Sequence, residues 1–179
     1  SQVDLAAWRA AWGRLIDAAA AAVVFSRDSR AHVLAAYPGA GDRLVLRPHM
    51  LPAPPGRVVP PAPGGQPVIG VLGNIGQQKG AGVVAAAAAS REAGLVLIGN
   101  IDPAYALSPG TVTHGTYRPE DIADLAQRYR IAAWLIPSVW PETFSFTTHE
   151  ALATGLPVWC FDLGAQAEAQ VRLTVRHAR

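Results

Sequence analysis

Two glutamates, Glu142 and Glu150, enclose seven residues in the stretch WPETFSFTTHE, which spans positions 140–150. Carboxylates accept hydrogen bonds from hydroxyl groups, so a pair of acids suits a ligand rich in sugar hydroxyls. An alternative interpretation needs no ligand. In it, Thr147 and Glu150 form a capping box at a helix start, Ser145 is a second candidate cap, and Glu142 faces water.

A glycine-rich turn lies upstream, in the sequence GNIGQQKG at positions 73–80. Its glycines fit neither the dinucleotide pattern G-x-G-x-x-G nor the phosphate-loop pattern, which needs a hydroxyl residue after the lysine. The turn still places Lys79 where a helix begins, and the free amides of a helix N-terminus favour an anion. The sequence supports a phosphate site here no more strongly than a tight turn with a solvated lysine.

A third loop, HGTYRPED at positions 114–121, offers an aromatic face at Tyr117 and room for close approach at Gly115. A tyrosine in such a place is more often a half-buried core residue than a stacking partner for a base. The amides around Phe144–Phe146 and Lys79 would attract phosphate, while the acids would accept sugar hydroxyls. A nucleotide sugar carries both groups and would use all three loops.

Short apolar strands alternate with helices after position 66, which predicts an α/β fold with a parallel, Rossmann-like sheet and helices on both faces. Ligands of such sheets bind at the carboxyl ends of the strands, where the three loops stand. Helices are predicted to end at Gly94 and Gly155. The predicted strands span 67–73, 95–100, 111–115, 132–138 and 156–162, and the helices span 79–93, 119–130 and 146–155, with a further helix beginning near 165.

The N-terminal part has a different organisation. Apolar residues at helical spacing, including Trp8 and Trp12, predict an amphipathic helix within the first twenty residues. A strand over 22–26, a helix capped by Ser26 and stopped at Pro38, and a strand over 43–49 follow. The segment LPAPPGRVVPPAPGGQP, residues 51–67, is too rich in proline and glycine for a helix or a central strand. It marks the strongest predicted boundary in the chain.

Composition narrows the class of protein. The chain has 179 residues, a formal charge of +2 and one cysteine, Cys160, which fits a reducing compartment. No run of about 18 apolar residues and no signal peptide is visible, so a cytoplasmic location is expected. The histidines are scattered singly, without metal-ligand spacing. The basic tail (Arg172, Arg176, His177, Arg179) suits contact with a membrane surface or nucleic acid, although a solvated end is favoured.

Residues 66–168 resemble the donor-binding half of a retaining glycosyltransferase with the two-Rossmann-domain (GT-B) fold, family 4. The turn GNIGQQKG, the loop HGTYRPEDIADL and the block PSVWPETFSFTTHEALATGLPVWCFDLG stand where that family has its corresponding motifs. The last block is the most specific, because its paired acids and its Ala-x-Gly-x-Pro-Val run keep the family's spacing. The resemblance outweighs the capping-box alternative, although Glu150 could do both jobs.

The resemblance implies a role for each residue. Lys79 would bind the diphosphate of a UDP- or GDP-linked sugar, Glu142 would contact the donor sugar near the reacting carbon, and Glu150 would hold the ribose. Catalysis would rest on Glu142 and Lys79. Asn74 replaces the family's usual arginine, which removes one charge from the phosphate site. No metal or other cofactor is expected, since no Asp-x-Asp occurs. The remaining donor-binding residues would be Gly73, Asn74, Gly76, Gly115, Thr116, Tyr117, Thr143, Phe144, Ser145 and Phe146.

The resemblance also divides the chain. It implies a remnant of the acceptor-side domain over 1–50, a hinge over 51–66 and a donor domain over 67–179, truncated at its end. The chain is thus expected to be a hexosyl-type glycosyltransferase fragment that binds donor without turnover. The carbohydrate or lipid-linked acceptor would be held by the missing domain. No nucleic-acid partner is expected, and peripheral attachment at the inner membrane face stays open.

Two alternatives accompany this interpretation. One is a nucleotide-sugar epimerase of the same architecture, in which the paired-glutamate block is less expected. The other is a degenerate domain kept for protein association, favoured by Asn74 and by the tryptophans of the first helix, Trp8 and Trp12.

Overall fold

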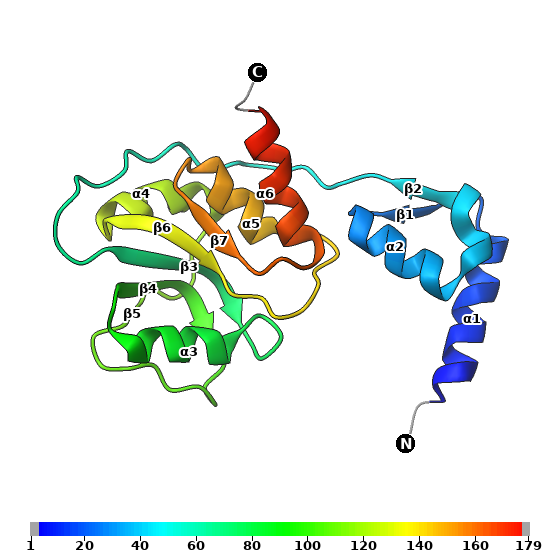
Figure 1. The fold of residues 1–179 in the computed structure, drawn as a ribbon, viewed down its shortest axis with the longest axis horizontal. Helices are drawn as coiled ribbons and strands as arrows, with labels where there is room; N and C mark the ends of the chain where they lie inside the picture. The colour runs from blue at the N-terminus through cyan, green and yellow to red at the C-terminus, as the bar shows by residue number, and fades with distance from the viewer. Residues whose placement is uncertain (1–3, 177–179) are drawn as a thin grey trace.

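A five-stranded parallel sheet forms the larger unit of the computed structural model, which describes residues 4–176 and, from residue 171 on, only the backbone (Figure 1). The strand order β5-β4-β3-β6-β7 places β3 at the centre, and the chain winds outward from it first in one direction and then in the other. This arrangement confirms the predicted α/β, Rossmann-like fold. The strands are β3 (Val68–Ile75), β4 (Gly94–Ile101), β5 (Val112–Thr113), β6 (Ile131–Ile136) and β7 (Val158–Cys160).

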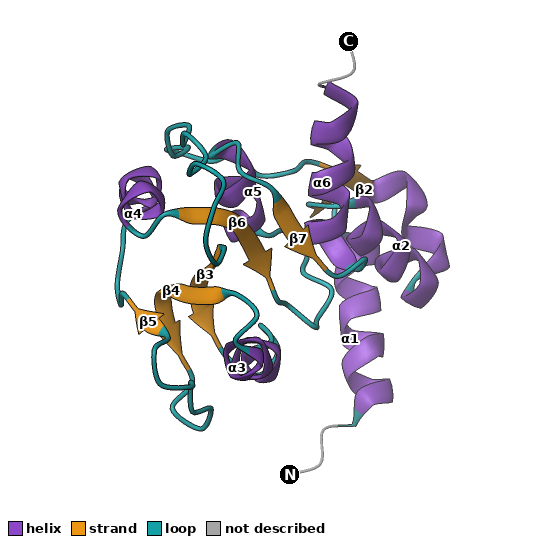
Figure 2. Cartoon of the chain, turned by 60° about the vertical axis from the view of Figure 1, so that its left-hand side comes forward, coloured by secondary structure: helices purple, strands orange, loops and turns teal. Residues whose placement is uncertain are grey.

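Helices cover both faces of this sheet, because successive residues of its central strands are apolar on both sides. Val71 and Leu97 pack in a cluster with α3, whereas Leu72 and Ile98 pack in a second cluster with α4 and α5. Figure 2 shows α3 on one side of the sheet and α4 and α5 on the other. The helices are α3 (Ala81–Ser90), α4 (Ile122–Arg128) after the short 3-10 turn η2 (Pro119–Asp121), α5 (Phe146–Ala153) and α6 (Gly164–Arg176).

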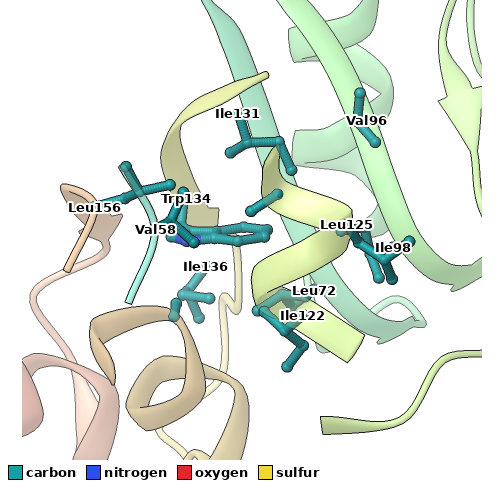
Figure 3. Packing of buried hydrophobic residues seen from close by; sticks show 12 residues of the cluster. Val58, Leu72, Val96, Ile98, Ile122, Leu125, Ile131, Trp134, Ile136 and Leu156 are labelled. Carbon is teal, nitrogen blue, oxygen red and sulfur yellow. The ribbon is translucent and has the colours of Figure 1, made fainter. Parts of the chain in front are cut away.

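Trp134 lies at the centre of the second cluster (Figure 3). Its side chain is fully buried, and its indole Nε1 donates a 2.9 Å hydrogen bond to Thr154 Oγ1. A side chain at Gly70 would collide with the indole ring, so glycine is required where β3 passes beneath it. This packing fixes β6 against β3, the two strands whose carboxyl ends carry the candidate site.

A smaller unit precedes the sheet. It pairs β1 and β2 in parallel as a separate two-stranded sheet. Ser26 caps α2 as predicted, since Ser26 Oγ accepts a 3.0 Å hydrogen bond from Ser29 N. Trp8 and Trp12 are about half exposed on the first helix. The elements are α1 (Leu5–Ala18), β1 (Ala22–Val24), α2 (Arg27–Ala36), the 3-10 helix η1 (Pro38–Arg43) and β2 (Leu44–Leu46).

The proline-rich connector, residues 47–67, forms neither helix nor strand. This confirms the prediction for residues 51–67, whereas the strand predicted over 43–49 ends already at Leu46. It crosses the larger unit as an extended segment before it enters β3 (Figure 1). Val58 is buried in the Trp134 cluster, and its backbone N donates a 2.8 Å hydrogen bond to Thr154 O. The connector is therefore anchored on the sheet unit at its middle.

One helix end differs from the prediction. The helix α3 ends at Ser90, followed by Arg91 at the C-cap position with a left-handed φ of 55°, and Gly94 is instead the first residue of β4. Gly94 N donates a 2.8 Å hydrogen bond to Pro67 O, and Gly94 pairs with Val68. This ladder begins the strand earlier than the apolar run alone suggests. Within residues 4–176, each helix is too short or too polar to cross a bilayer.

Candidate functional site

The carboxyl ends of β3 and β6 form the point where the sheet reverses its winding direction, the usual ligand position in such folds. Two loops leave from here, residues 76–80 after β3 and 137–145 after β6. They are joined directly, since Gln78 O accepts a 3.1 Å hydrogen bond from Val139 N. The buried Ser138 hydroxyl lies 3.3 Å from the same carbonyl and 3.2 Å from Trp140 O.

Two glycines, Gly80 and Gly73, allow the loops after β3 and β6 to pack this closely. Gly80 precedes α3 with a left-handed φ of 83°, and a side chain there would collide with the carbonyl oxygen of Pro137. Gly73 has a φ of 110°, and a Cβ there would lie 3.3 Å from Thr147 Cγ2 in the first turn of α5. These two glycines let both loops and both helix starts approach one another.

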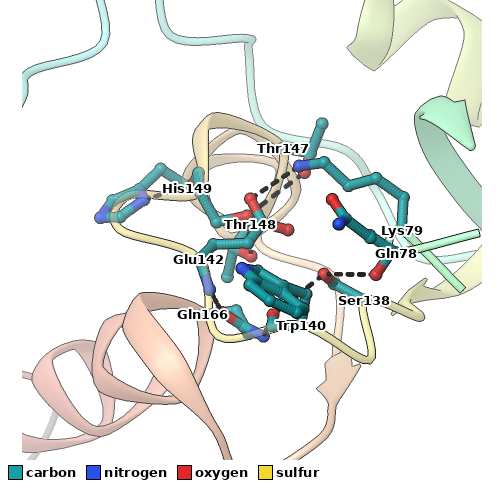
Figure 4. A network of polar contacts seen from close by, with 10 residues as sticks. Gln78, Lys79, Ser138, Trp140, Glu142, Thr147, Thr148, His149 and Gln166 are labelled. Carbon is teal, nitrogen blue, oxygen red and sulfur yellow. Dashed lines mark hydrogen bonds and ion pairs between the residues drawn. The ribbon is translucent and has the colours of Figure 1, made fainter. Parts of the chain in front are cut away.

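Lys79 and Glu142 meet across these loops (Figure 4). Lys79 Nζ lies 2.7 Å from Glu142 Oε2, with the lysine side chain 47% exposed and the glutamate side chain 9% exposed. The second carboxylate oxygen, Glu142 Oε1, is buried and has no hydrogen-bond partner among the described residues. Glu142 is therefore not the water-facing loop acid of the ligand-free alternative. Glu142 thus retains one unsatisfied acceptor, which a ligand hydroxyl could reach only after the carboxylate had turned outward.

The backbone around Glu142 is held by the start of α6. The fully buried Gln166 accepts from Glu142 N at 3.2 Å and donates to Trp140 O at 3.0 Å. Ala165 N donates to Glu142 O at 2.9 Å. A Cβ at Gly164 would lie 2.6 Å from Glu142 N, which explains the tight fit of the two segments. Sequence analysis did not identify Gln166, since a single glutamine carries no pattern.

The capping-box interpretation of Thr147 and Glu150 is wrong. The helix α5 begins at Phe146, so Thr147 lies inside its first turn, and Ser145 is the residue with extended φ and ψ at the N-cap position. The Ser145 hydroxyl makes no bond to a helix amide and instead accepts a 2.8 Å bond from Thr148 Oγ1. As at every helix start, the first amides of α5 have no acceptor within the helix, and the Ser145 side chain does not supply one.

Glu150 and Tyr117 form a second polar region. Glu150 is 7% exposed, and its burial raises the pKa of its carboxyl group. Burial, followed by the charge of Glu150, raises the pKa of Tyr117 to about 12. Tyr117 is half-buried and packs against the Trp134 cluster, as favoured from sequence, while its ring remains close enough to Glu150 to feel its charge.

The other predicted residues surround these groups at the same sheet edge. Gly115 has a φ of 89°, with open space where a side chain would be, and its N donates to Gly99 O at 3.2 Å. Gly76 also faces open space. Asn74 is exposed and accepts a 3.2 Å bond from Asn100 Nδ2 rather than contacting Lys79. Thr116 and Thr143 are exposed.

The rings of Phe144 and Phe146 face the N-terminal unit. The Phe144 ring lies 5.2 Å from the His49 ring and stacks on His149 at 4.4 Å. The Phe146 ring lies 5.4 Å from that of His49. The predicted role of these two residues uses their backbone amides, so this orientation of the rings does not conflict with it.

Five cavities formed by the described residues are lined by residues other than Lys79, Glu142 and Glu150, so none of these five encloses the candidate site. No group of three or more histidine, cysteine or acidic side chains that could hold a metal occurs among the described side chains. The basic tail (Arg172, Arg176, His177, Arg179) lies outside the residues whose side chains are described.

In comparisons with known proteins, the sequence matches no protein-family model and no curated protein. The resemblance to glycosyltransferases therefore stays a prediction that rests on the motifs and on the geometry of the sheet edge.

Proposed function

We propose that this chain is the donor-binding half of a retaining, GT-B-type glycosyltransferase, which takes a nucleoside diphosphate sugar at the β3–β6 edge. One observation carries the proposal: Lys79 and the buried Glu142 meet at the reversal point of the sheet, 2.7 Å apart, with one carboxylate oxygen unpartnered. A cation and an acceptor placed together suit a ligand in which a sugar adjoins a diphosphate.

Each group would then have a definite task. Lys79 and the amides that remain unsatisfied in the first turns of α3 and α5 would bind the diphosphate and stabilise the charge that develops as it leaves. The Glu142 carboxylate would accept a hydroxyl of the donor sugar, and Glu150 would accept those of the ribose. Gly115 and Thr116, which leave open space beside Tyr117, would border the base.

Calorimetric titration with UDP and GDP tests the proposal. We expect binding at millimolar to tens of micromolar concentrations, about −4 to −7 kcal/mol. Lys79→Ala should weaken binding by about tenfold or more, because a charge-assisted contact to phosphate contributes about 1.5–3 kcal/mol. Arg91→Ala, which removes an exposed cation at the opposite end of α3, is the matched control. The absence of heat with both nucleotides would refute the proposal.

A second candidate, a role in protein association, is favoured by one feature. Trp8 and Trp12 line an apolar cavity of about 510 Å³ that is open at the surface of the small unit. Replacement of Glu142 and Glu150 by glutamine separates the two functions. An associating domain should keep its partner-dependent phenotype after both changes, whereas a donor-binding domain should lose nucleotide-sugar binding.

A further inference from the structure

Glu168 connects the two units through the start of α2. Its Oε1 accepts a 2.6 Å hydrogen bond from Asp28 N, and its Oε2 accepts a 3.1 Å bond from Arg27 N. Ser26 Oγ satisfies the next amide, that of Ser29. The three leading amides of α2 thus all have acceptors, and two of them are supplied by a carboxylate 140 residues away. A carboxylate is also favoured there by the helix dipole.

A cluster of rings reinforces this contact. The Phe25 ring of the small unit stacks at 4.0 Å on the His49 ring at the start of the connector. His49 in turn meets Phe144, on the loop that follows Glu142, and Phe146, the first residue of α5. Five rings from both units thereby form one chain of contacts that ends on His149. The small unit consequently rests on the same loop that carries the candidate site.

The start of α6 contacts both the loop that carries Glu142 and the start of α2. Gln166 and Ala165 hold the backbone of Glu142, as described above, and Glu168 lies only two residues further along the same helix. Figure 1 shows α6 between the large sheet and α2. A helix that holds two segments is a physical connection through which a displacement of one could bias the position of the other.

We propose that the first turns of α6 couple the N-terminal unit to Glu142, with Glu168 as a positioning residue that grips α2 and Gln166 as one that grips the Glu142 loop. The coupling does not depend on which ligand binds at the sheet edge. If the proposed donor binds there, the position of the small unit sets the geometry of Glu142. By reciprocity, occupation of the site would in turn stabilise the grip on α2.

Amide hydrogen exchange on the full chain, read residue by residue, tests this proposal without any ligand. In Glu168→Ala we expect exchange at Arg27 and Asp28 to rise about tenfold or more, because a carboxylate acceptor is lost. Exchange at Glu142 and Ala165 should rise severalfold in the same variant. Glu168→Gln retains one acceptor oxygen and should restore part of the protection at both places.

Glu92→Ala serves as the matched control, because Glu92 is an exposed glutamate beyond the end of α3. It should leave all four amides unchanged. If exchange in Glu168→Ala becomes faster only at Arg27 and Asp28, the coupling to Glu142 is refuted. If exchange at Arg27 and Asp28 does not change, Glu168 does not hold the start of α2. A melting temperature close to that of the parent protein shows that the Glu168 variants are folded. Because no nucleotide is used, the result does not depend on the donor proposal.

Discussion

Glu142 competes with a bound diphosphate for Lys79, which makes Glu142→Gln an informative change. In the unliganded protein the lysine already has an anionic partner at 2.7 Å. A diphosphate must displace that carboxylate and then tolerate its negative charge nearby. Removal of the charge should therefore raise the affinity for a nucleoside diphosphate, although it removes a residue of the proposed site.

The size of the effect follows from the exposure of the pair. Lys79 is about half exposed, so solvent screens the pair and limits its contribution to about 0.2–1 kcal/mol. The buried position of Glu142 favours the upper end, about 1 kcal/mol, which is about fivefold in affinity. A nucleotide sugar instead loses its charged hydroxyl acceptor, worth about 1.5–3 kcal/mol. Its affinity should fall by about threefold or more.

Calorimetry with matched ligands measures both changes. UDP and GDP, each with a hexose conjugate, are titrated into the parent protein, Glu142→Gln and the control Glu92→Gln. We expect the ratio of nucleotide-sugar affinity to nucleotide affinity to fall by about fifteenfold or more in Glu142→Gln, with opposite signs for the two ligands. An unchanged ratio, or weaker binding of the bare diphosphate, would refute competition between Glu142 and phosphate for Lys79.

Three further predictions concern stability, each measured by urea unfolding. Gly80→Ala should lower the free energy of unfolding by more than about 2 kcal/mol, because it combines a left-handed backbone with a collision at Pro137 O. In the control Gly76→Ala the new side chain meets open space, so the free energy of unfolding should fall by less than about 1 kcal/mol. Equal costs would contradict the close packing of the two loops. Thr154→Val should cost about 1–3 kcal/mol, because it leaves the buried Trp134 Nε1 without an acceptor. A neutral result would show that the indole finds another partner. Burial raises the folded-state pKa of Glu150 above its ordinary value of 4.5, so the folded state holds the proton more tightly than the unfolded state does. The contribution of Glu150 to the free energy of unfolding is therefore largest below pH 4.5 and is lost as the pH rises through the raised pKa. Glu150→Gln should remove that part of the pH dependence, and identical pH profiles for parent and variant would contradict it.

The sheet could be predicted from sequence because local patterns specify it. Residues such as Val71 and Leu72 are apolar on both faces of β3, which is typical of a strand covered on two sides. The placement of Lys79 and Glu142 at one edge followed from the rule for carboxyl ends of parallel strands. Their direct contact depends on the geometry of the two loops. Gly80 permits that geometry, but a glycine at this position is not enough to predict it from the sequence.

Other features depend on contacts between distant segments, for which the sequence has no periodic signal. Glu168 bonds to amides 140 residues earlier, and Gln166 bonds to a loop 24 residues earlier. The motif Thr147-x-x-Glu150 satisfies the capping-box pattern, yet α5 begins at Phe146 with Ser145 at the N-cap position, so Thr147 lies inside the helix. Tertiary packing decided these positions over local preference.

The central position of β3 has a consequence during synthesis of the chain on the ribosome. β4 follows β3 closely and can pair with it early, whereas β6, the other neighbour of β3, begins 56 residues after β3 ends, as the bounds Val68–Ile75 and Ile131–Ile136 show. Until β6 emerges, a nascent chain displays an apolar, unpaired strand edge, which is a template for aggregation. The Lys79 loop would then exist without its partner, and the β3–β6 edge would be among the last parts of the sheet to form.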